Sequence, residues 1–352
     1  MPNKKTLYIV GAGASSEAKM PTGNELKDKI AKYLDIRFEH GGFSQLSGDA
    51  YIVSALRIHA KQEGIDRGDI NPHLHAARRI RDAMPQAISI DNFIDTHSDD
   101  KKIELCGKLA IVRSILDAEK NSMLYIDNPN NYNKLNFSSL KKIWYSSFMM
   151  LLTENCKKED LSSRLRSIAL IVFNYDRCIE HFLYNSLMNY YGIQPEEAAK
   201  FINEIEIYHP YGVVGNLPWQ GDQSVEFGSQ PEANKLLELA GQIKTFTEGT
   251  DPNSSEILAI QKNVTDSEKI VFLGFAFHEL NMKLMSPDKK IPTRFKPTAY
   301  FGTADGISDS DCDIIKSELR DFKNNNLKGI YINNKLKCAG FFKEYWRSLS
   351  LN

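Results

Sequence analysis

The sequence lacks the cysteine patterns that hold metals or form redox pairs. No two of its five cysteines lie within four residues of each other; they are Cys106, Cys156, Cys178, Cys312 and Cys338. This spacing excludes a zinc ribbon and a Cys-x-x-Cys motif, and no metal site is predicted. An odd number of cysteines with no secretory signal suits a reducing compartment.

Long apolar runs and an excess of charge of one sign are also missing. No run approaches the roughly 20 apolar residues that span a bilayer, and Thr6–Val10 is too short for the core of a signal peptide. Lys and Arg number 44 against 45 Asp and Glu, for a formal charge of -1. We therefore predict a cytoplasmic protein without membrane contact, and nucleic acid is not indicated as a partner.

The composition is that of an ordinary globular protein, with 352 residues of which 42% are hydrophobic. The length predicts roughly two domains. Short buried runs such as Leu7–Val10 and Ser167–Phe173 alternate with helical periodicities, which is typical of a parallel sheet with helical crossovers. Between about residues 37 and 160 the pattern is mostly helical, without a convincing buried strand.

These patterns predict an α/β fold with a Rossmann-like, mostly parallel sheet flanked by helices. The Rossmann-like domain is discontinuous and consists of residues 1–36 and 161–352. Residues 37–160 form a large helical insertion after the first strand–helix unit. Further strands are expected at residues 205–208, 269–274, 298–302 and 328–332.

A glycine turn, Gly11-Ala-Gly-Ala-Ser15, closes the first predicted strand. Glycine lets the backbone approach a pyrophosphate there, and the start of the next helix supplies oriented N–H groups. The dinucleotide fingerprint is incomplete, because Ser16 replaces its third glycine and no carboxylate ends an obvious second strand about 20 residues on. The turn therefore predicts either a nucleotide site or a tight turn without a ligand.

Five segments, taken in order, resemble the SIR2-like family of sirtuin relatives found among bacterial anti-phage NADases. They are Gly11–Ser15, Pro21–Leu26, Phe173–Asp176, Tyr208–Gly212 and Gly274–Phe277. The first two are similar to the family's first NAD-contacting segment, and Asn174-Tyr-Asp176 is similar to its Asn-x-Asp motif. Ile90–Phe93, in the predicted insertion, also resembles a segment common in bacterial members.

The chain departs from the family pattern in two ways, and each limits the activities that the resemblance implies. The cysteine spacing leaves no four-cysteine zinc module, so protein deacylation is not expected. The family has a catalytic His directly before Gly, where this chain has Tyr211 before Gly212, and His209 stands two residues earlier. Alternate residues of a strand share a side, so His209 reaches the site if the strand persists, whereas Pro210 can bend the chain and prevent it.

The resemblance implies three catalytic residues. Asn174 would hold the ribose or the attacking water, Asp176 would face the nicotinamide amide, and His209 would act as a general base. The alternative for Asn174 and Asp176 is a turn and helix cap, which both residue types favour without any ligand. The alternative for His209 is a strand-end histidine with a local partner.

The resemblance also implies a set of residues that bind NAD+ without a metal. The set is Gly11, Ala12, Gly13, Ala14, Ser15, Pro21, Thr22, Asp91, Tyr211, Gly212, Gly274, Phe275 and Thr303. Asp91 is expected over the nicotinamide end of the cleft, or else as a helix N-cap. Gly274 would let the backbone approach the ligand closely.

Taken together, these residues predict a glycohydrolase that cleaves the nicotinamide–ribose bond of its substrate NAD+ to give nicotinamide and ADP-ribose. The resemblance further implies a role in anti-phage defence, held in check by a homo-oligomer or by a partner protein of the defence system. The alternative is a catalytically weak sensor or scaffold module that binds NAD+ or ADP-ribose, which Tyr211 at the usual His position favours.

Overall fold

Six strands form one parallel sheet in the computed structural model. The structure describes residues 5–39, 44–64, 69–127, 134–221, 224–245, 254–286, 297–323 and 326–351. In spatial order the strands are β5 (Glu206–Tyr208), β4 (Ile168–Val172), β1 (Thr6–Val10), β6 (Lys269–Leu273), β7 (Thr298–Thr303) and β8 (Leu327–Asn333). The predicted α/β, Rossmann-like fold class is confirmed.

The order of the strands sets where the sheet binds ligands. The chain starts at β1, moves outward through β4 to β5, returns to β6 on the other side of β1, and continues through β7 to β8. Every residue of β1 and β4 is buried, as expected for central strands covered on both faces. The reversal of direction puts the topological switch point between β1 and β6, at the carboxyl edge where such folds bind ligands.

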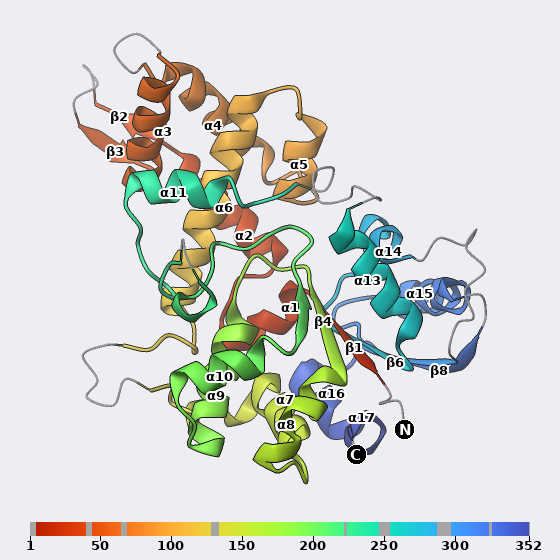
Figure 1. The fold of residues 1–352 in the computed structure, drawn as a ribbon. Helices are drawn as coiled ribbons and strands as arrows, with labels where there is room; N and C mark the ends of the chain where they lie inside the picture. The colour runs from red at the N-terminus through yellow and green to blue at the C-terminus, as the bar shows by residue number, and fades with distance from the viewer. Residues whose placement is uncertain are drawn as a thin grey trace.

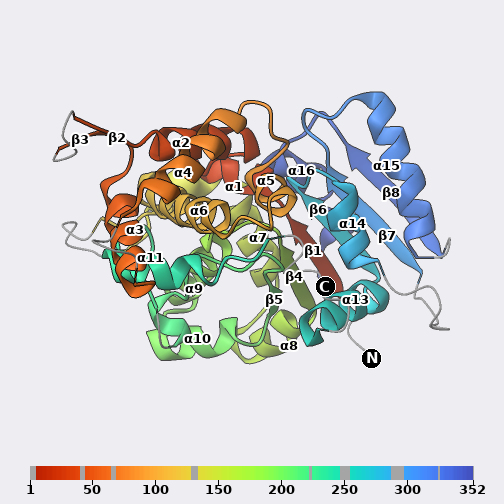
Figure 2. The ribbon, with the colours of Figure 1, turned by 90° about the horizontal axis from the view of Figure 1, so that it is seen from above.

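Helices flank this sheet and occupy the chain segments that connect its strands (Figures 1 and 2). Those outside residues 37–160 are α1 (Ala12–Ser15), α2 (Gly23–Leu34), α8 (Leu161–Arg166), α9 (Cys178–Tyr191), α10 (Pro195–Ile202), α11 (Ala233–Ala240), α13 (Ser255–Asp266), α14 (Glu279–Met285), α15 (Asp309–Phe322), α16 (Cys338–Glu344) and α17 (Trp346–Leu349).

Residues 37–160 contribute a helical layer and one small hairpin. The helices are α3 (Ala50–Gln62), α4 (Asn71–Ala83), α5 (Ile90–Thr96), α6 (Lys101–Asn121) and α7 (Trp144–Thr153), and the hairpin strands are β2 (Arg37–Phe38) and β3 (Gln45–Ser47). Figure 1 shows α3, α4 and α6 gathered on the side of the molecule away from β8. Helices α2 and α11 pack against α6, so three parts of the chain build this layer.

Glu17 fastens the segment after β1 to two distant helices. One of its carboxylate oxygens accepts the N–H of Trp144 at the start of α7, and the other accepts the N–H of Ala339 at the start of α16, both at 2.9 Å. The indole N–H of Trp144 donates to the carbonyl of Ala14, also at 2.9 Å. Because helix N-termini favour a carboxylate, Glu17 holds the glycine turn in place.

Candidate functional site

The glycine turn packs directly against the loop that follows β6. The N–H of Gly13 donates to the carbonyl oxygen of Gly274 at 3.0 Å. Gly274 has a φ of +54°, and a Cβ built on it would lie 1.9 Å from the backbone nitrogen of Ala14. A Cβ on Gly11 would lie 2.5 Å from the Gly274 oxygen. The predicted tight turn is therefore present, and contact between two backbone segments is enough to require all three glycines.

Backbone N–H groups of the turn that a bound phosphate would need already donate to carbonyl oxygens of the protein. The N–H of Gly11 donates to the Leu273 carbonyl at 2.9 Å, and that of Ala14 donates to the Gly11 carbonyl at 3.0 Å. Gly13 remains exposed and Ala12 is only partly buried. A ligand can therefore reach the turn, but a phosphate has to compete with hydrogen bonds already made.

Ser15, Asn174 and Asp176 come together at the carboxyl ends of β1 and β4. The side-chain amide of Asn174 donates to Ser15 Oγ at 3.0 Å, and the hydroxyl of Tyr145 lies 3.3 Å from the same oxygen. Ser15 also hydrogen-bonds the carboxyl of Asp176. Ser15 is 1% exposed, Asn174 7% and Asp176 5%. The two strands are adjacent and parallel, so the residues that follow them meet.

The N-cap of α9 is Arg177, so Asp176 is not the helix cap that the sequence left as an alternative, although its carboxyl bonds the first helical residue. Its Oδ1 accepts the N–H of Cys178, the first residue of α9, at 3.1 Å. Burial raises the pKa of Asp176 above its usual value, against the opposing hydrogen bonds from Cys178 and Ser15. Its carboxyl is thus fixed in position and poorly hydrated, so a cation brought near it would be strongly attracted.

His209 lies in a turn, because β5 ends at Tyr208. The N–H of Gly212 donates back to the carbonyl of His209 at 2.9 Å, which closes the turn around Pro210. The alternation of a strand therefore stops before this segment. His209 and Tyr211 face different neighbours, so the bend at Pro210 that the sequence left open does occur.

The imidazole of His209 lies between two hydrogen-bond acceptors. Its Nδ1 is 3.3 Å from the backbone carbonyl oxygen of Asn174, and its Nε2 is 2.6 Å from Oε1 of Glu180. Burial by itself lowers the pKa of His209, but the charge and hydrogen bond of Glu180, with the Asn174 carbonyl and Asp176, outweigh it and raise the pKa. Because both ring nitrogens face acceptors, these surroundings favour the doubly protonated ring.

Tyr211 and Asp91 belong to a second cluster that joins the helical layer to the sheet edge. The hydroxyl of Tyr211 donates to the side-chain oxygen of Asn281 on α14, and its ring packs on Phe173 and Tyr175. The hydroxyl of Tyr175 donates to the carboxylate of Asp91 on α5. Burial raises the pKa of Asp91 to about 7. Tyr175 stands between Asn174 and Asp176 in the chain, so this second cluster adjoins the first.

The alternative prediction that Asp91 is a helix N-cap is wrong. Ser89 is the N-cap of α5, with an extended backbone and a side-chain oxygen that accepts the N–H of Asn92 at 3.1 Å. Serine caps helices as well as aspartate does, and its position two residues earlier leaves Asp91 in the first turn, where its carboxyl faces Tyr175.

Three further predicted residues support the backbone near the edge. A Cβ on Gly212, whose φ is +73°, would lie 2.1 Å from the backbone oxygen of Gln242. The hydroxyl of Thr303 accepts the N–H of Gly274 at 2.8 Å. Phe275 is 3% exposed and packs among other aromatic rings. Each contact explains the residue without a ligand, and none tests NAD+ binding.

Pro21 and Thr22 lie at the start of α2. Both the N–H and the hydroxyl of Thr22 donate to the carboxylate of Glu25, at 2.7 and 2.8 Å. This is a capping box, in which the third helical residue reaches back to the cap. Pro21 and Thr22 are partly buried, so both remain within reach of a ligand at this edge.

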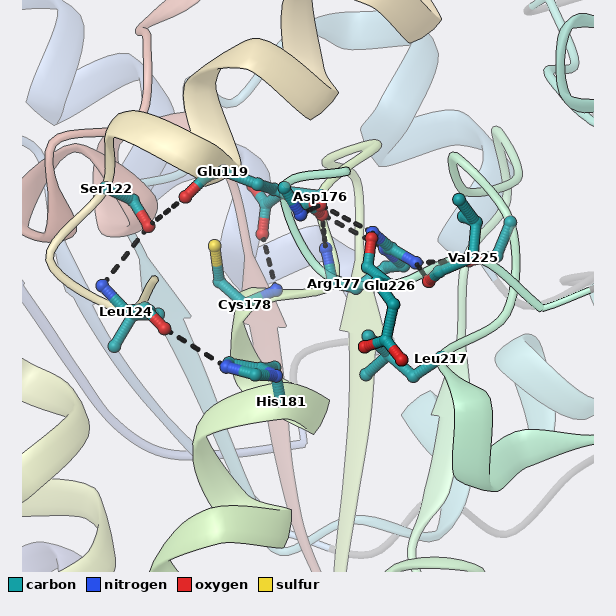
Figure 3. A network of polar contacts seen from close by, with 12 residues as sticks. Glu119, Ser122, Leu124, Asp176, Arg177, Cys178, His181, Leu217, Val225 and Glu226 are labelled. Atoms are coloured by element: carbon teal, nitrogen blue, oxygen red, sulfur yellow. Dashed lines mark hydrogen bonds and ion pairs between the residues drawn. The ribbon is translucent and has the colours of Figure 1, made fainter. Parts of the chain in front are cut away.

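Arg177 and Glu119 form a buried ion pair immediately beside Asp176 (Figure 3). Arg177 is 1% exposed and Glu119 is fully buried. The Nε of Arg177 donates to Glu119 at 3.0 Å and its Nη1 to the carbonyl of Val225 at 2.6 Å. Glu119 also accepts the N–H of Gly228 at 2.9 Å. The pair thus ties α6, the start of α9 and the loop after β5 together.

A cavity of about 220 Å³ opens beside β5, away from the switch point. Its lining comprises Arg177, Glu180, Ile202, Asn203, Ile205, Ile207, His209, Val213, Asn216 and Gln220. Sites for drug-sized ligands measure about 300–1,000 Å³, so this cavity is small for a dinucleotide. His209 therefore contacts Asn174 on one side and a separate small cavity on the other.

Sequence reasoning missed Glu180, Tyr145 and Asn281. The sequence does hint at a role for Glu180, because it stands in α9 among Ile179, Phe182 and Leu183, and all residues from Cys178 to Leu183 are buried. A charge within an apolar helical stretch indicates a partner. Tyr145 and Asn281 carried no such signal, since their roles follow only from how distant segments pack.

Comparison with known proteins leaves the family undetermined. No protein-family model matches the chain, and no curated protein matches it. Within the part of the chain that the structure describes, no group of three or more His, Cys, Asp or Glu residues is arranged to hold a metal ion. No helix in that part is long and apolar enough to cross a membrane.

Proposed function

We propose that the protein is an NAD+ glycohydrolase whose reaction takes place beside Asn174 and Asp176. The observation that carries the proposal is the cluster in which an amide and a carboxyl meet through the Ser15 hydroxyl. This cluster lies at the carboxyl edge of β1 and β4, next to the switch point where doubly wound folds bind nucleotides.

The cluster suits cleavage of a glycosidic C–N bond. As the bond breaks, its electron pair leaves with the nicotinamide nitrogen and positive charge develops on the ribose, where a buried carboxylate such as Asp176 stabilises it. Water then adds to the ribose carbon and loses a proton, which gives ADP-ribose. The Asn174 amide has the donors and acceptor needed to orient that water or a ribose hydroxyl.

Access to the cluster requires movement. Asn174 and Asp176 are less than 10% exposed, so a dinucleotide reaches them only when neighbouring side chains open. The contacts from Tyr175 to Asp91 and from Tyr211 to Asn281 join this edge to α5 and α14. We propose that these two contacts separate when NAD+ binds.

The test is release of nicotinamide from NAD+ by the purified chain, followed by chromatography. Asn174→Ala should lower the rate by about 100-fold or more, as expected for loss of a group that acts in the transition state. Asn185→Ala is the matched control, because its side chain donates only locally to the His181 carbonyl on α9, and it should retain the wild-type rate. Equal rates in the wild type and Asn174→Ala would refute the proposal.

The sensor or scaffold function is the second candidate, and one observation favours it. Both nitrogens of His209 face acceptors, an arrangement that favours the protonated ring and disfavours its action as a base. If the module is a sensor, calorimetry should detect binding of NAD+ or ADP-ribose without nicotinamide release, and His209→Ala should leave that binding unchanged.

The resemblance alone supports a proposal about biological context. We propose that the protein acts in the cytoplasm in anti-phage defence, where a homo-oligomer or a partner protein restrains NAD+ cleavage. Measuring cellular NAD+ after infection, in cells that carry the wild type or Asn174→Ala, tests this: only the wild type should deplete NAD+.

A further inference from the structure

The cavity beside β5 combines aliphatic and polar side chains in its lining. Four of the lining residues are aliphatic: Ile202, Ile205, Ile207 and Val213. The pair formed by Glu180 and His209, here called the floor, also lines it, and the lining residues Asn203, Asn216 and Gln220 are exposed. Aliphatic side chains beside convergent polar groups suit a small ligand that has a short apolar part and a polar head.

Glu180 carries an unused hydrogen-bonding capacity at this floor. Its side chain is 5% exposed, and its Oε1 is engaged by Nε2 of His209 at 2.6 Å. Among the residues that the structure describes, Glu180 Oε2 is buried and has no hydrogen-bond partner. Buried carboxylate oxygens are nearly always paired. Because the terminal torsion of glutamate is soft, a small rotation offers either oxygen to the cavity.

Arg177, although it also lines the cavity, does not make the site attractive to anions. Its guanidinium already donates to Glu119 and to the carbonyls of Val225 and Glu226. The group on the floor that lacks a partner is therefore the Glu180 carboxylate, which accepts hydrogen bonds. The matching ligand is a hydrogen-bond donor with positive charge.

We propose that this cavity binds a small organic cation, an amine or amidinium with a short aliphatic body, and that its binding releases the proton of His209. The cation replaces the imidazolium as the partner of Glu180, so one positive charge enters and one proton leaves. The groups facing His209 are Glu180 from α9, with Asp176 and the carbonyl of Asn174 from the segment before it. Neutral His209 then keeps its proton on Nδ1, which donates to the Asn174 carbonyl, and Nε2 is left without a proton on the Glu180 side. The binding claim stands by itself, whereas its effect on catalysis rests on the proposed function.

The experiment is calorimetric titration of the full chain with isobutylammonium, with isobutyramide and isobutyrate as a neutral and an anionic probe of similar shape. Isobutylammonium should bind, more tightly as the pH rises, and the other two should bind at least tenfold more weakly. Glu180→Gln and Val213→Trp, which remove the charge and fill the cavity, should each weaken binding at least tenfold. Ile314→Trp, on an exposed position of α15, is the matched control and should not change it.

NMR titration of the histidine rings in the unmodified chain tests the proton release directly. The resonance of His209 is identified by its loss in His209→Gln, and its apparent pKa should fall when isobutylammonium saturates the protein. Absence of binding, equal binding of isobutyrate, unchanged affinity in a folded Val213→Trp, or an unmoved His209 pKa would each overturn the proposal. None of these readouts uses NAD+, so their failure leaves the proposed function untouched.

Discussion

Two buried pairs of opposite charge start from the same helix, α9, and differ in how completely they are satisfied. Arg177 and Glu119 are surrounded by backbone partners, including the carbonyl of Val225 and the N–H of Gly228. Glu180 and His209 border a cavity, and one oxygen of Glu180 has no partner among the described residues. A fully paired buried network fixes structure, whereas an incompletely paired one is where a ligand or a proton can act.

The largest effect is expected at the fully paired network. Glu119→Gln leaves the Arg177 charge buried without its counterion, which should lower the free energy of unfolding by about 3–5 kcal/mol. Denaturation in urea measures it. Asp266→Asn, which breaks the exposed Lys262–Asp266 pair, is the control and should change stability by less than about 1 kcal/mol. Similar losses of unfolding free energy in both variants would show that the buried pair matters no more than an exposed one.

The backbone contact between Gly274 and the glycine turn involves no charge and shows how much close packing alone stabilises this edge. Gly274→Ala should destabilise the protein by more than Gly306→Ala. Both positions have positive φ, but a Cβ on Gly274 meets backbone at 1.9 Å and one on Gly306 meets nothing within 4 Å. The conformational strain alone is about 1–3 kcal/mol at each site. The difference between the two unfolding free energies measures the close packing, and a difference of zero would contradict it.

The incompletely paired network should show itself in pH dependence. The pKa of His209 is raised, so the stability it contributes is complete below the ordinary pKa near 6.5 and is lost as the pH rises through the higher folded value. Glu180→Gln removes the main cause of the rise. It should lower the His209 pKa and flatten this dependence, by about 1.4 kcal/mol for each tenfold loss of the ring's proton affinity. Unfolding measured from pH 5.5 to 9 tests it; parallel curves for wild type and variant would contradict the pairing.

A pH effect of a different origin is expected at Asp91, which pairs with a hydroxyl rather than with a charge. Because burial raises its pKa to about 7, the folded state binds this proton more tightly than the unfolded chain, and stability falls as the pH rises from about 4 through 7. Asp91→Asn should remove that fall and make the variant more stable than the wild type at pH 8. Lower stability of the variant at pH 8 would show that the carboxylate is needed.

The sheet was predictable because its strands carry continuous apolar runs. Every residue of β1 and β4 is buried, and parallel pairing brings the residues after these strands together. The meeting of Ser15 with Asn174 and Asp176 follows from that topology. The directions of side chains within turns were not predictable. Strand alternation would put His209 and Tyr211 on one side, but the bend at Pro210 separates them.

Contacts between distant segments escaped prediction for a different reason. Tyr211 meets Asn281, and Tyr175 meets Asp91, because helices α14 and α5 pack at the sheet edge. No local pattern in the sequence specifies that packing. Glu180 is intermediate: its charge in an apolar helix predicts a partner, but not which one.

The most direct measurement of the central claim is a crystal structure of Asn174→Ala, the slow variant, grown with NAD+. The account predicts the nicotinamide ribose at the carboxyl edge of β1 and β4, beside residue 174 and Asp176, with Tyr175 and Tyr211 moved away from Asp91 and Asn281. A dinucleotide bound elsewhere, with Ser15 and Asp176 still enclosed as they are here, would contradict it.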